Sequence, residues 1–452
     1  MRKYHKYKNS NVKWIGQIPD SWLVSNIRYN TKVVGRIGYR GYTVEDIVGD
    51  GEGAISLSPS NIQNQKFDLS KRTYISWDKY EESPEIQVFE GDIILVKTAS
   101  VGKVAYVDTL VGEKATINPQ LVVFKEVTLS PRFLYYYLIS NDFQYQIDRD
   151  NYGGVVGTLT QASINSYKIL IPSDFEQTKI AQYLDHQTAI IDQLIQKKEK
   201  LVQLLKEKRQ AVINEAVTKG LNPNAKMKNS GIEWLGEVPE EWEVTKMKFI
   251  AKLNPSKSEI ESSINDEDFV SFLPMDKVGE DWSYDKTSLA KYNEVSSGLT
   301  YFKEGDIIMA KITPCFENGK ATILESLTNG IGFGSTEFHT IRPLKIDRSY
   351  LFYVTRSDYF MSNGESFMTG SAGQKRVPTS FVNDFYVPIP KSEEQVEIAT
   401  FIEDYFKRSN ILSSQLFSQI EKLKEYRQSI ISEAVTGKID VRDWQPNKKQ
   451  VA

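Results

Sequence analysis

The chain carries the motif SNVKWIGQIPDSWLV at residues 10–24 and nearly repeats it as SGIEWLGEVPEEWEV at residues 230–244. Both copies follow the pattern W-[IL]-G-x-[IV]-P-x-x-W, so two tryptophans, a glycine and a proline recur at an offset of 220 residues. Self-similarity of this kind is the sequence signature of a repeat architecture. The fold is therefore expected to contain two related units.

Three further motifs recur in the same order, at two different offsets. The offset is 214 residues for the first of them and 218 residues for the other two. The halves therefore differ in length within their globular parts, whereas 172–218 and 390–436 match without an insertion. Loops tolerate insertions, but one inserted residue turns a helix face by about 100°. A variable globular unit followed by a helix of fixed length is expected in each half. The paired motifs are GDIILVK (91–97) with GDIIMAK (305–311), ILIPSDFEQ (169–177) with VPIPKSEEQ (387–395), and KRQAVINEAVT (208–218) with YRQSIISEAVT (426–436).

Each fixed segment predicts one long helix of about 40 residues, or roughly 60 Å. Apolar residues fall at alternating steps that sum to seven, which is the spacing of a coiled-coil seam. The simplest way to bury both stripes is to pack the two helices together as an antiparallel coiled coil; two unrelated surface helices are the alternative. The predicted seam consists of Leu184, Ile191, Ile195, Val202, Leu205 and Val212 with Ile402, Leu416, Ile420, Leu423 and Ile430. Polar residues interrupt it at Lys198, Arg209, Ser409, Ser413 and Arg427.

The globular units read as strand-rich, because short apolar runs follow Gly-Asp turns and others stop at proline. The expected fold class is α+β: two globular β-rich domains separated by two long helices packed as an antiparallel coiled coil, with a pseudo-twofold internal repeat. The expected boundaries are 1–172 for the first domain, 173–218 for the central helix, 219–390 for the second domain, 391–437 for the C-terminal helix and 438–452 for a tail.

Composition is that of an ordinary folded protein, with a formal net charge of −3. Residues 1–172 hold 20 Lys and Arg against 18 Asp and Glu, and residues 219–390 hold 19 against 24. A nucleic-acid surface would therefore have to be a local patch. No apolar run is long enough to span a membrane, no secretory signal is recognisable, and Cys315 is the only cysteine, so a cytoplasmic location is expected.

Motifs of several enzyme classes are missing from the sequence. There is no Pro-Pro pair, so the Asn/Asp-Pro-Pro-aromatic loop of amino-group DNA methyltransferases is absent, and no G-x-x-x-x-G-K-[ST] segment indicates an ATPase. No acidic residue is followed two positions later by lysine, as in many nucleases. One cysteine and three scattered histidines predict no zinc site. The chain is expected to be non-catalytic and to bind no metal.

The architecture resembles the specificity subunits of Type I restriction–modification systems. The resemblance rests on the duplicated tryptophan motif, on Ile-Pro before each helix and on [KY]-R-Q-x-[IV]-I-x-E-A-V-T at its end, and it covers residues 10–440. It implies that each globular unit is a target-recognition domain that reads one half-site of a bipartite sequence in double-stranded DNA. The coiled coil would set the spacing between the half-sites.

The resemblance also implies the partners. Two modification (methyltransferase) subunits would bind the helices, restriction (translocase and nuclease) subunits would join the complex, and no membrane would be involved. This chain would bind no cofactor, since S-adenosylmethionine, ATP and Mg belong to the partner subunits. A non-catalytic coiled-coil scaffold with two adhesive β-rich domains is the alternative function, and an enzyme with an unrecognised site is another.

Candidate DNA contacts lie in loops, because base reading needs polar groups near the groove and cations near phosphates. Three kinds of segment qualify: the Arg/Gly stretch at 35–41, the turns after the GDII strands, and the glycine-rich loops before each final strand. Ordinary solvated loops are the alternative. The candidates are Arg36, Arg40, Lys97, Thr98, Ser100, Lys103, Thr158, Thr160 and Gln161 in the first unit, and Lys311, Thr313, Lys320, Ser371, Gln374, Lys375 and Arg376 in the second.

Other prominent residues are expected to be structural. The four tryptophans of the repeated motif, Trp14, Trp22, Trp234 and Trp242, are expected to anchor the core. The Glu-Gln pairs at 176–177 and 394–395 are expected to satisfy helix N-termini.

Overall fold

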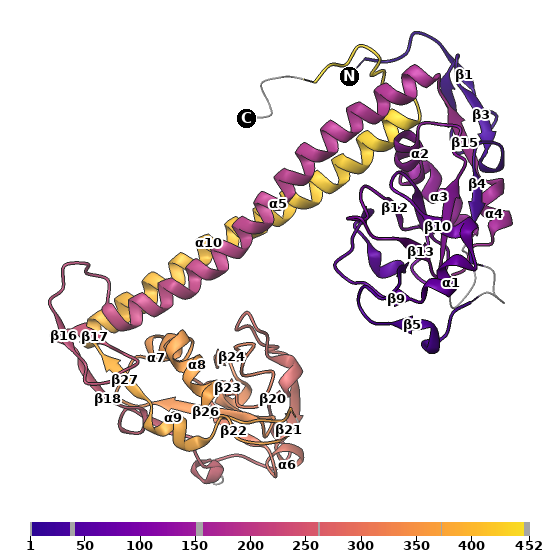
Figure 1. Cartoon of the computed structure of the whole chain (residues 1–452). Coiled ribbons are helices and arrows are strands. Elements are labelled where there is room, and N and C mark those ends of the chain that lie inside the picture. Colours follow the sequence, from indigo (N-terminus) through magenta and orange to yellow (C-terminus); the bar gives the residue numbers. More distant parts are fainter. Residues whose placement is uncertain (1, 37–40, 151–156, 261–262, 372, 447–452) are drawn as a thin grey trace. The chain divides into compact units, whose positions relative to one another are not determined.

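The computed structural model describes residues 2–36, 41–150, 157–260, 263–371 and 373–446, which form two compact units (Figure 1). Unit 1 contains residues 1–198 and 418–452, and unit 2 contains residues 199–417. Two long helices, α5 (Asp174–Lys219) and α10 (Ser392–Val435), contribute to both units. We call the residues before α5 the first domain and those between α5 and α10 the second domain. No helix in the described ranges is apolar over a length that would cross a membrane.

The first domain is built on a four-stranded antiparallel sheet with the order β12-β11-β14-β4. Its strands are β12 (Val104–Tyr106), β11 (Ile93–Val96), β14 (Leu121–Lys125) and β4 (Lys32–Val34). Helices α2 (Pro131–Leu138), α3 (Asn141–Asp150) and α4 (Gln161–Ser166) follow, with α1 (Trp77–Glu81) earlier. The remaining strands are the sheet β10 (Gln87–Val88), β13 (Ala115–Ile117), β6 (Ala54–Leu57), β9 (Tyr74–Ile75) and β5 (Ile47–Val48), and the pairs β1 (Tyr7–Asn9) with β2 (Gln17–Pro19), β3 (Leu23–Asn26) with β15 (Lys168–Ile171) and β7 (Ile62–Gln63) with β8 (Lys66–Phe67).

The second domain repeats the four-stranded sheet in the same order, β24-β23-β26-β19. Its strands are β24 (Ala321–Ile323), β23 (Ile307–Ala310), β26 (Phe338–Pro343) and β19 (Ala251–Leu253), and its helices are α6 (Tyr292–Val295), α7 (Arg348–Thr355), α8 (Asp358–Ser366) and α9 (Thr379–Asp384). A second sheet has the order β21 (Leu289–Lys291), β20 (Phe269–Leu273), β25 (Ile331–Gly334) and β22 (Thr300–Lys303), and the pairs are β16 (Met227–Asn229) with β17 (Glu237–Pro239) and β18 (Glu243–Lys246) with β27 (Tyr386–Ile389).

The GDII motifs are apolar throughout because both faces of their strands are buried. In β11, Ile93 and Leu95 pack into the core that contains α2 and α3, whereas Ile94 and Val96 pack into a separate core on the other face. A strand covered on both sides loses the alternation of apolar and polar residues that a one-sided strand shows. The central strand of the second four-stranded sheet is packed on two sides as well, since Ile307 and Met309 of β23 lie in one core and Ile308 lies in another.

The aspartate of each Gly-Asp turn pairs with a cation on the neighbouring strand. Asp306 accepts hydrogen bonds from the Arg342 guanidinium at 2.7 and 2.8 Å and from the backbone amide of Lys303 at 2.8 Å. Asp92 forms the equivalent pair with Lys125. A bidentate pair of this kind fixes geometry as well as charge. These ion pairs tie the start of the central strand to the end of its neighbour in both domains.

The second tryptophan of each motif anchors the first turn of the long helix. Trp22 donates its indole N–H to Glu176 Oε1 at 3.2 Å, and Trp242 donates to Glu394 Oε2 at 3.0 Å. Both indoles are fully buried. A buried indole N–H needs an acceptor, and the helix supplies it in each half.

The first tryptophan of each motif differs from the expectation of a core anchor. Trp14 and Trp234 are only half-buried, and each packs against a neighbouring aromatic ring, Tyr145 and Phe385 respectively. They lie at the edge of the core rather than inside it.

The glutamines of the Glu-Gln pairs cap a different helix from their own. Gln177 Oε1 accepts the backbone N–H of Ser130 at 2.7 Å, at the start of α2, and Gln395 Oε1 accepts that of Asp347 at 2.8 Å, at the start of α7. Glu176 does cap its own helix, since its Oε2 accepts the backbone N–H of Ser173 at 3.2 Å while its own N–H donates to the Ser173 hydroxyl at 3.4 Å.

The two long helices pack antiparallel within each unit, as predicted. In unit 1, Asp192 pairs with Arg427 at 2.9 Å and Lys198 donates to Gln419 at 2.5 Å, so residue numbers rise on α5 as they fall on α10. In unit 2, the Arg209 guanidinium donates to Asn410. Three of the polar seam positions thus hold interhelical bonds. Of the seam, Leu184, Ile191, Val202, Val212, Ile402, Leu416, Ile420 and Ile430 are buried, and Ile195, Leu205 and Leu423 are half-buried.

The end of α5 docks against the second domain, not against the domain that precedes it. Gln210 Nε2 donates to the backbone carbonyl of Arg356 at 2.9 Å, and Asn214 Oδ1 accepts the backbone N–H of Asp358 at 2.8 Å. The RQ-x-x-x-N part of the closing motif therefore holds the junction of α7 and α8.

The end of α10 makes the same contacts with the first domain. Gln428 Nε2 donates to the carbonyl of Ile139 at 2.8 Å, and Ser432 Oγ accepts the N–H of Asn141 at 2.9 Å. Each globular domain is thus held by the start of one long helix and by the end of the other.

Removing either side-chain acceptor tests this exchange. We expect Asn214→Ala to destabilise the second domain and Ser432→Ala to destabilise the first, each by about 1 kcal/mol, because a helix-terminal N–H loses its partner. Amide hydrogen exchange, resolved by peptide, should accelerate in α8 for Asn214→Ala and in α3 for Ser432→Ala. Acceleration in the opposite domain would contradict this assignment, and each variant serves as the control for the other.

Candidate nucleic-acid interface

Two of the predicted loop segments meet in the first domain. We call residues 97–103, after β11, the strand loop, and the described residues 157–161 the glycine loop. Leu159 N donates to Lys97 O at 2.7 Å, and Ala99 N donates to the carbonyl of Gly157 at 3.1 Å. Thr98 and Thr158 also form an antiparallel bridge. Segments about 60 residues apart in the chain thus form one surface.

The corresponding segments meet in the same way in the second domain. Its strand loop is 311–320, and its glycine loop consists of the described residues 369–371 and 373–376. Val377 N donates to Lys311 O at 2.8 Å, which repeats the bond between Leu159 and Lys97. The Thr313 hydroxyl donates to the carbonyl of Lys375 at 3.0 Å and accepts its N–H at 3.1 Å. Thr313 therefore joins the loops rather than presenting a free hydroxyl.

The first-domain candidates divide into exposed groups and structural ones. Lys103, Thr158, Thr160 and Gln161 are exposed, whereas Lys97, Thr98 and Ser100 are half-buried. Gln161 Nε2 donates to the carbonyl of Val33 at 3.4 Å, which leaves one amide proton and Oε1 for another partner. Burial lowers the pKa of Lys97. Thr160 Oγ1 accepts the N–H of Ser163 at 3.0 Å and so caps α4. This cap commits the Thr160 hydroxyl to the fold.

Arg36 does not lie on the surface, contrary to the expectation of an exposed cation. It is 4% exposed, and its guanidinium donates to the carbonyl of Ile117 at 3.0 Å and to the hydroxyl of Thr116 at 3.1 Å. A buried guanidinium with backbone and hydroxyl acceptors supports β13 rather than reaching for a phosphate. The other predicted arginine of this stretch, Arg40, lies outside the described residues.

The second-domain candidates carry less free positive charge than their sequence indicates. Arg376 forms a bidentate ion pair with Glu337 at 2.8 and 2.9 Å, which raises the pKa of its guanidinium, and Lys320 donates to the carbonyl of Met275 at 3.3 Å. Ser371, Gln374 and Lys375 are exposed, and Lys311 is half-buried. The exposed candidates therefore gather on the glycine loop.

Sequence reasoning missed the residue that joins these loops to a third segment. His339 on β26 is 2% exposed, and its Nε2 donates to the carbonyl of Val377 at 2.9 Å. Its Nδ1 lies 3.3 Å from Asn254 Nδ2, and Asn254 Oδ1 accepts the N–H of Thr340 at 2.9 Å. The amide must therefore donate to Nδ1, so the imidazole is the neutral Nε2–H tautomer. A single histidine in a strand gives no sequence signal for this role.

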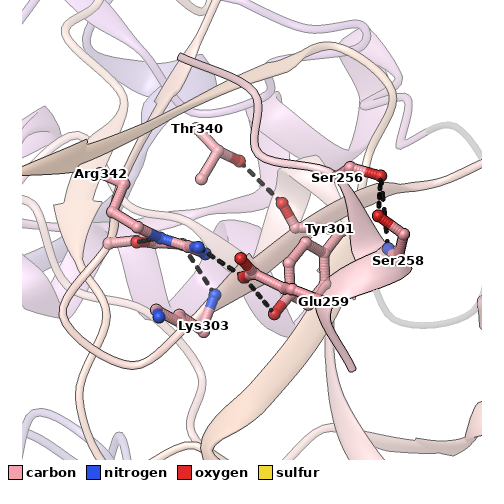
Figure 2. A network of polar contacts seen from close by, with 8 residues as sticks. Ser256, Ser258, Glu259, Tyr301, Lys303, Thr340 and Arg342 are labelled. Atoms are coloured by element: carbon pink, nitrogen blue, oxygen red, sulfur yellow. Dashed lines mark hydrogen bonds and ion pairs between the residues drawn. The ribbon is translucent and has the colours of Figure 1, made fainter. Parts of the chain in front are cut away.

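The segment after β19 is held by a network of polar contacts (Figure 2). Arg342 pairs with Glu259, and the Tyr301 hydroxyl donates to Glu259 Oε1 at 3.0 Å. The Thr340 hydroxyl donates to the Tyr301 carbonyl at 3.1 Å. Because Arg342 also binds Asp306, the same guanidinium fixes both the central strand and this segment.

The pH dependence of stability tests the assignment of His339. Burial lowers its pKa from the ordinary 6.5, although the bond to Val377 opposes this shift. The unfolded chain therefore binds a proton that the folded one rejects, and stability should be full above about pH 6.5 and fall as pH drops towards 5. Urea unfolding of the second domain at pH 7.5 and 5.5 measures it. Between these two pH values, the His339→Gln variant, whose side chain does not titrate, should lose less unfolding free energy than the wild-type protein. An equal loss in the variant and the wild type would contradict the assignment.

A family model for the Type I restriction modification DNA specificity domain matches residues 29–204 and 239–422. Among curated relatives, the Type I restriction enzyme EcoEI specificity subunit of Escherichia coli is 40% identical over 194 residues, which cover 41% of this chain and 32% of that protein. The chain thus spans about a third of the length of that relative. The Type I restriction enzyme MjaVIII specificity subunit of Methanocaldococcus jannaschii is 26% identical over 372 residues, covering 79% of this chain and 81% of that protein.

The fold matches a solved structure from work on complex assembly and conformational transition of the type I R-M system. The TM-score is 0.68 at 14% sequence identity, and the match covers 93% of this chain and 99% of that one. At this identity the likeness concerns the fold.

Proposed function

The chain belongs to the Type I restriction modification DNA specificity domain family, and on this premise we propose that it reads a bipartite target in double-stranded DNA. Each β-rich domain would recognise one half-site, and the recognition domains would span residues 1–172 and 219–390. The alternative, a scaffold with two adhesive domains, is not favoured by family membership.

One observation carries this proposal: the two domains present the same loop frame with different side chains. The backbone bond from Leu159 to Lys97 recurs as the bond from Val377 to Lys311. The exposed residues on that frame differ, with Thr158 and Gln161 in one domain and Ser371, Gln374 and Lys375 in the other. A common frame with divergent polar groups suits a protein that must hold two different sequences in equivalent orientations.

The exposed groups have the chemistry that base reading requires. The amides of Gln161 and Gln374 can each make two hydrogen bonds to adenine in the major groove, and Lys103 and Lys375 can contact phosphates. The half-buried Lys97, Thr98 and Ser100 line the same surface in the first domain. None of these roles requires a covalent step by this chain.

We further propose that the long helices bind two modification subunits, which supply S-adenosylmethionine and methyl transfer, and that restriction subunits supply ATP- and Mg-dependent translocation and cleavage. This chain would be the non-catalytic subunit that selects the site. Membership of the specificity family supports this division of labour.

Methylation mapping tests the proposal. Co-expression with the cognate modification subunit should place methylated adenines within a single bipartite motif of fixed spacing. Gln161→Ala should relax one half-site and Gln374→Ala the other, each by about 1–3 kcal/mol of base discrimination, because a bidentate contact is lost. Sequencing of host DNA for methylated adenines measures both effects, with the two variants as mutual controls. Absence of any motif from a complex that assembles and binds S-adenosylmethionine would refute the proposed function.

A further inference from the structure

A hollow of about 370 Å³ opens beside the strand loop of the second domain. Its wall is formed by residues 254, 255 and 257, by residues 296–301, and by Lys311 and Phe338. Lys311 is the residue whose carbonyl holds the glycine loop, and Asn254 is the residue bonded to His339. The hollow therefore lies where the loops proposed to read DNA converge.

Two lysines supply positive charge to this hollow. Lys257 Nζ donates to the carbonyl of Ser296 at 2.8 Å, which leaves two of its protons for another acceptor. The half-buried Lys311 ammonium makes no hydrogen bond or ion pair within the part of the chain that the structure describes. Hydroxyl groups of Ser297 and Thr300 add neutral donors to the wall.

Two nearby carboxylates have cationic partners of their own, but Glu259 shares Arg342 with Asp306, so these three groups keep one net negative charge. Glu259 is held by Arg342 and by the Tyr301 hydroxyl, as Figure 2 shows. Glu337 accepts hydrogen bonds from two of the three guanidinium nitrogens of Arg376. An anion in the hollow would face two ammonium groups whose acidic neighbours are occupied.

The contacts of Glu259 also fix the geometry of the site. Lys257 and Glu259 lie in the same short 3-10 turn, so the buried Arg342 guanidinium positions Lys257 through Glu259. The Ser256 hydroxyl receives bonds from the N–H and the hydroxyl of Ser258, at 3.3 and 2.9 Å, within this turn (Figure 2). Lys257 is thus held in place before a ligand arrives, which lowers the entropic cost of binding.

Within the described residues, the segment after β4 in the first domain begins differently from the segment after β19. Arg36 occupies the equivalent segment after β4, and its guanidinium is buried against β13 instead of facing an open surface.

We propose that this hollow binds one phosphate group of the DNA backbone, with Lys257 and Lys311 as its cations. The inference rests on the proposed function and adds to it a contact between the second domain and the DNA backbone of its half-site. Lys311 is a candidate from the sequence, whereas Lys257 is not. Such a contact sets the register of the loops without reading a base.

The salt dependence of binding tests the site in the assembled complex with the modification subunit. The association constant K is measured between the complex and the DNA target that it methylates. The double variant Lys257→Gln, Lys311→Gln should reduce the slope of log K against log salt concentration by about 0.9, because one phosphate contact is lost. Affinity should fall about tenfold at 0.1 M salt, by the same relation. Lys345→Gln, at the opposite end of β26, is the matched control and should leave the slope unchanged. Lys311→Arg should retain the wild-type slope.

Ethylation interference locates the contact. Ethylation of one phosphate in the half-site of the second domain should weaken wild-type binding and have no further effect on the double variant. A double variant with the wild-type slope and interference pattern, in a complex that still binds its target, overturns the phosphate site while the proposed function stands. A wild-type complex without sequence-specific binding overturns both. Unchanged thermal unfolding of the variants shows that the fold is intact.

Discussion

The backbone N–H of Asp358 donates a hydrogen bond to the side chain of Asn214, and the backbone N–H of Asn141 donates one to the hydroxyl of Ser432. These two bonds decide how the chain is organised, because they join the end of each long helix to a domain from the other half of the repeat. Trp22 and Trp242 hold the opposite helix ends through Glu176 and Glu394. Each domain is thereby clamped by two antiparallel helix segments.

In each four-stranded sheet the central strand is packed on both sides, whereas the loops that follow it differ between the two domains. The central strand is buried on both faces, and an aspartate at its start is paired with a cation on the next strand. Breaking a buried pair leaves an uncompensated charge, at a cost of several kcal/mol. The loops after these strands can then differ in composition on the same frame, as the proposed reading of two different half-sites requires.

Much of the fold, and part of the candidate site, could be predicted from the sequence. The seam residues of α5 and α10 are buried or half-buried, and the strand and glycine loops named from their composition do meet. The prediction of Arg36 as an exposed cation is wrong, because the residues that bury its side chain are distant in the sequence. Arg376 is paired with Glu337, 39 residues away, and His339 binds Val377, 38 residues away, and Asn254, 85 residues away. Contacts between residues far apart in the chain produce no repeating pattern in the sequence from which they could be predicted.

Repetition, constant helix length and seven-residue spacing are local properties of the chain, so they alone predict two related globular units and an antiparallel helix pair. Which domain each helix end holds is not local. The closing motif reads as the end of its own half, yet its glutamine and its Asn or Ser face the other domain. Only the tertiary structure decides this, because the hydrogen-bond partners are backbone groups at the α7–α8 and α2–α3 junctions. Every residue type carries such a backbone group, so the sequence does not mark the partner.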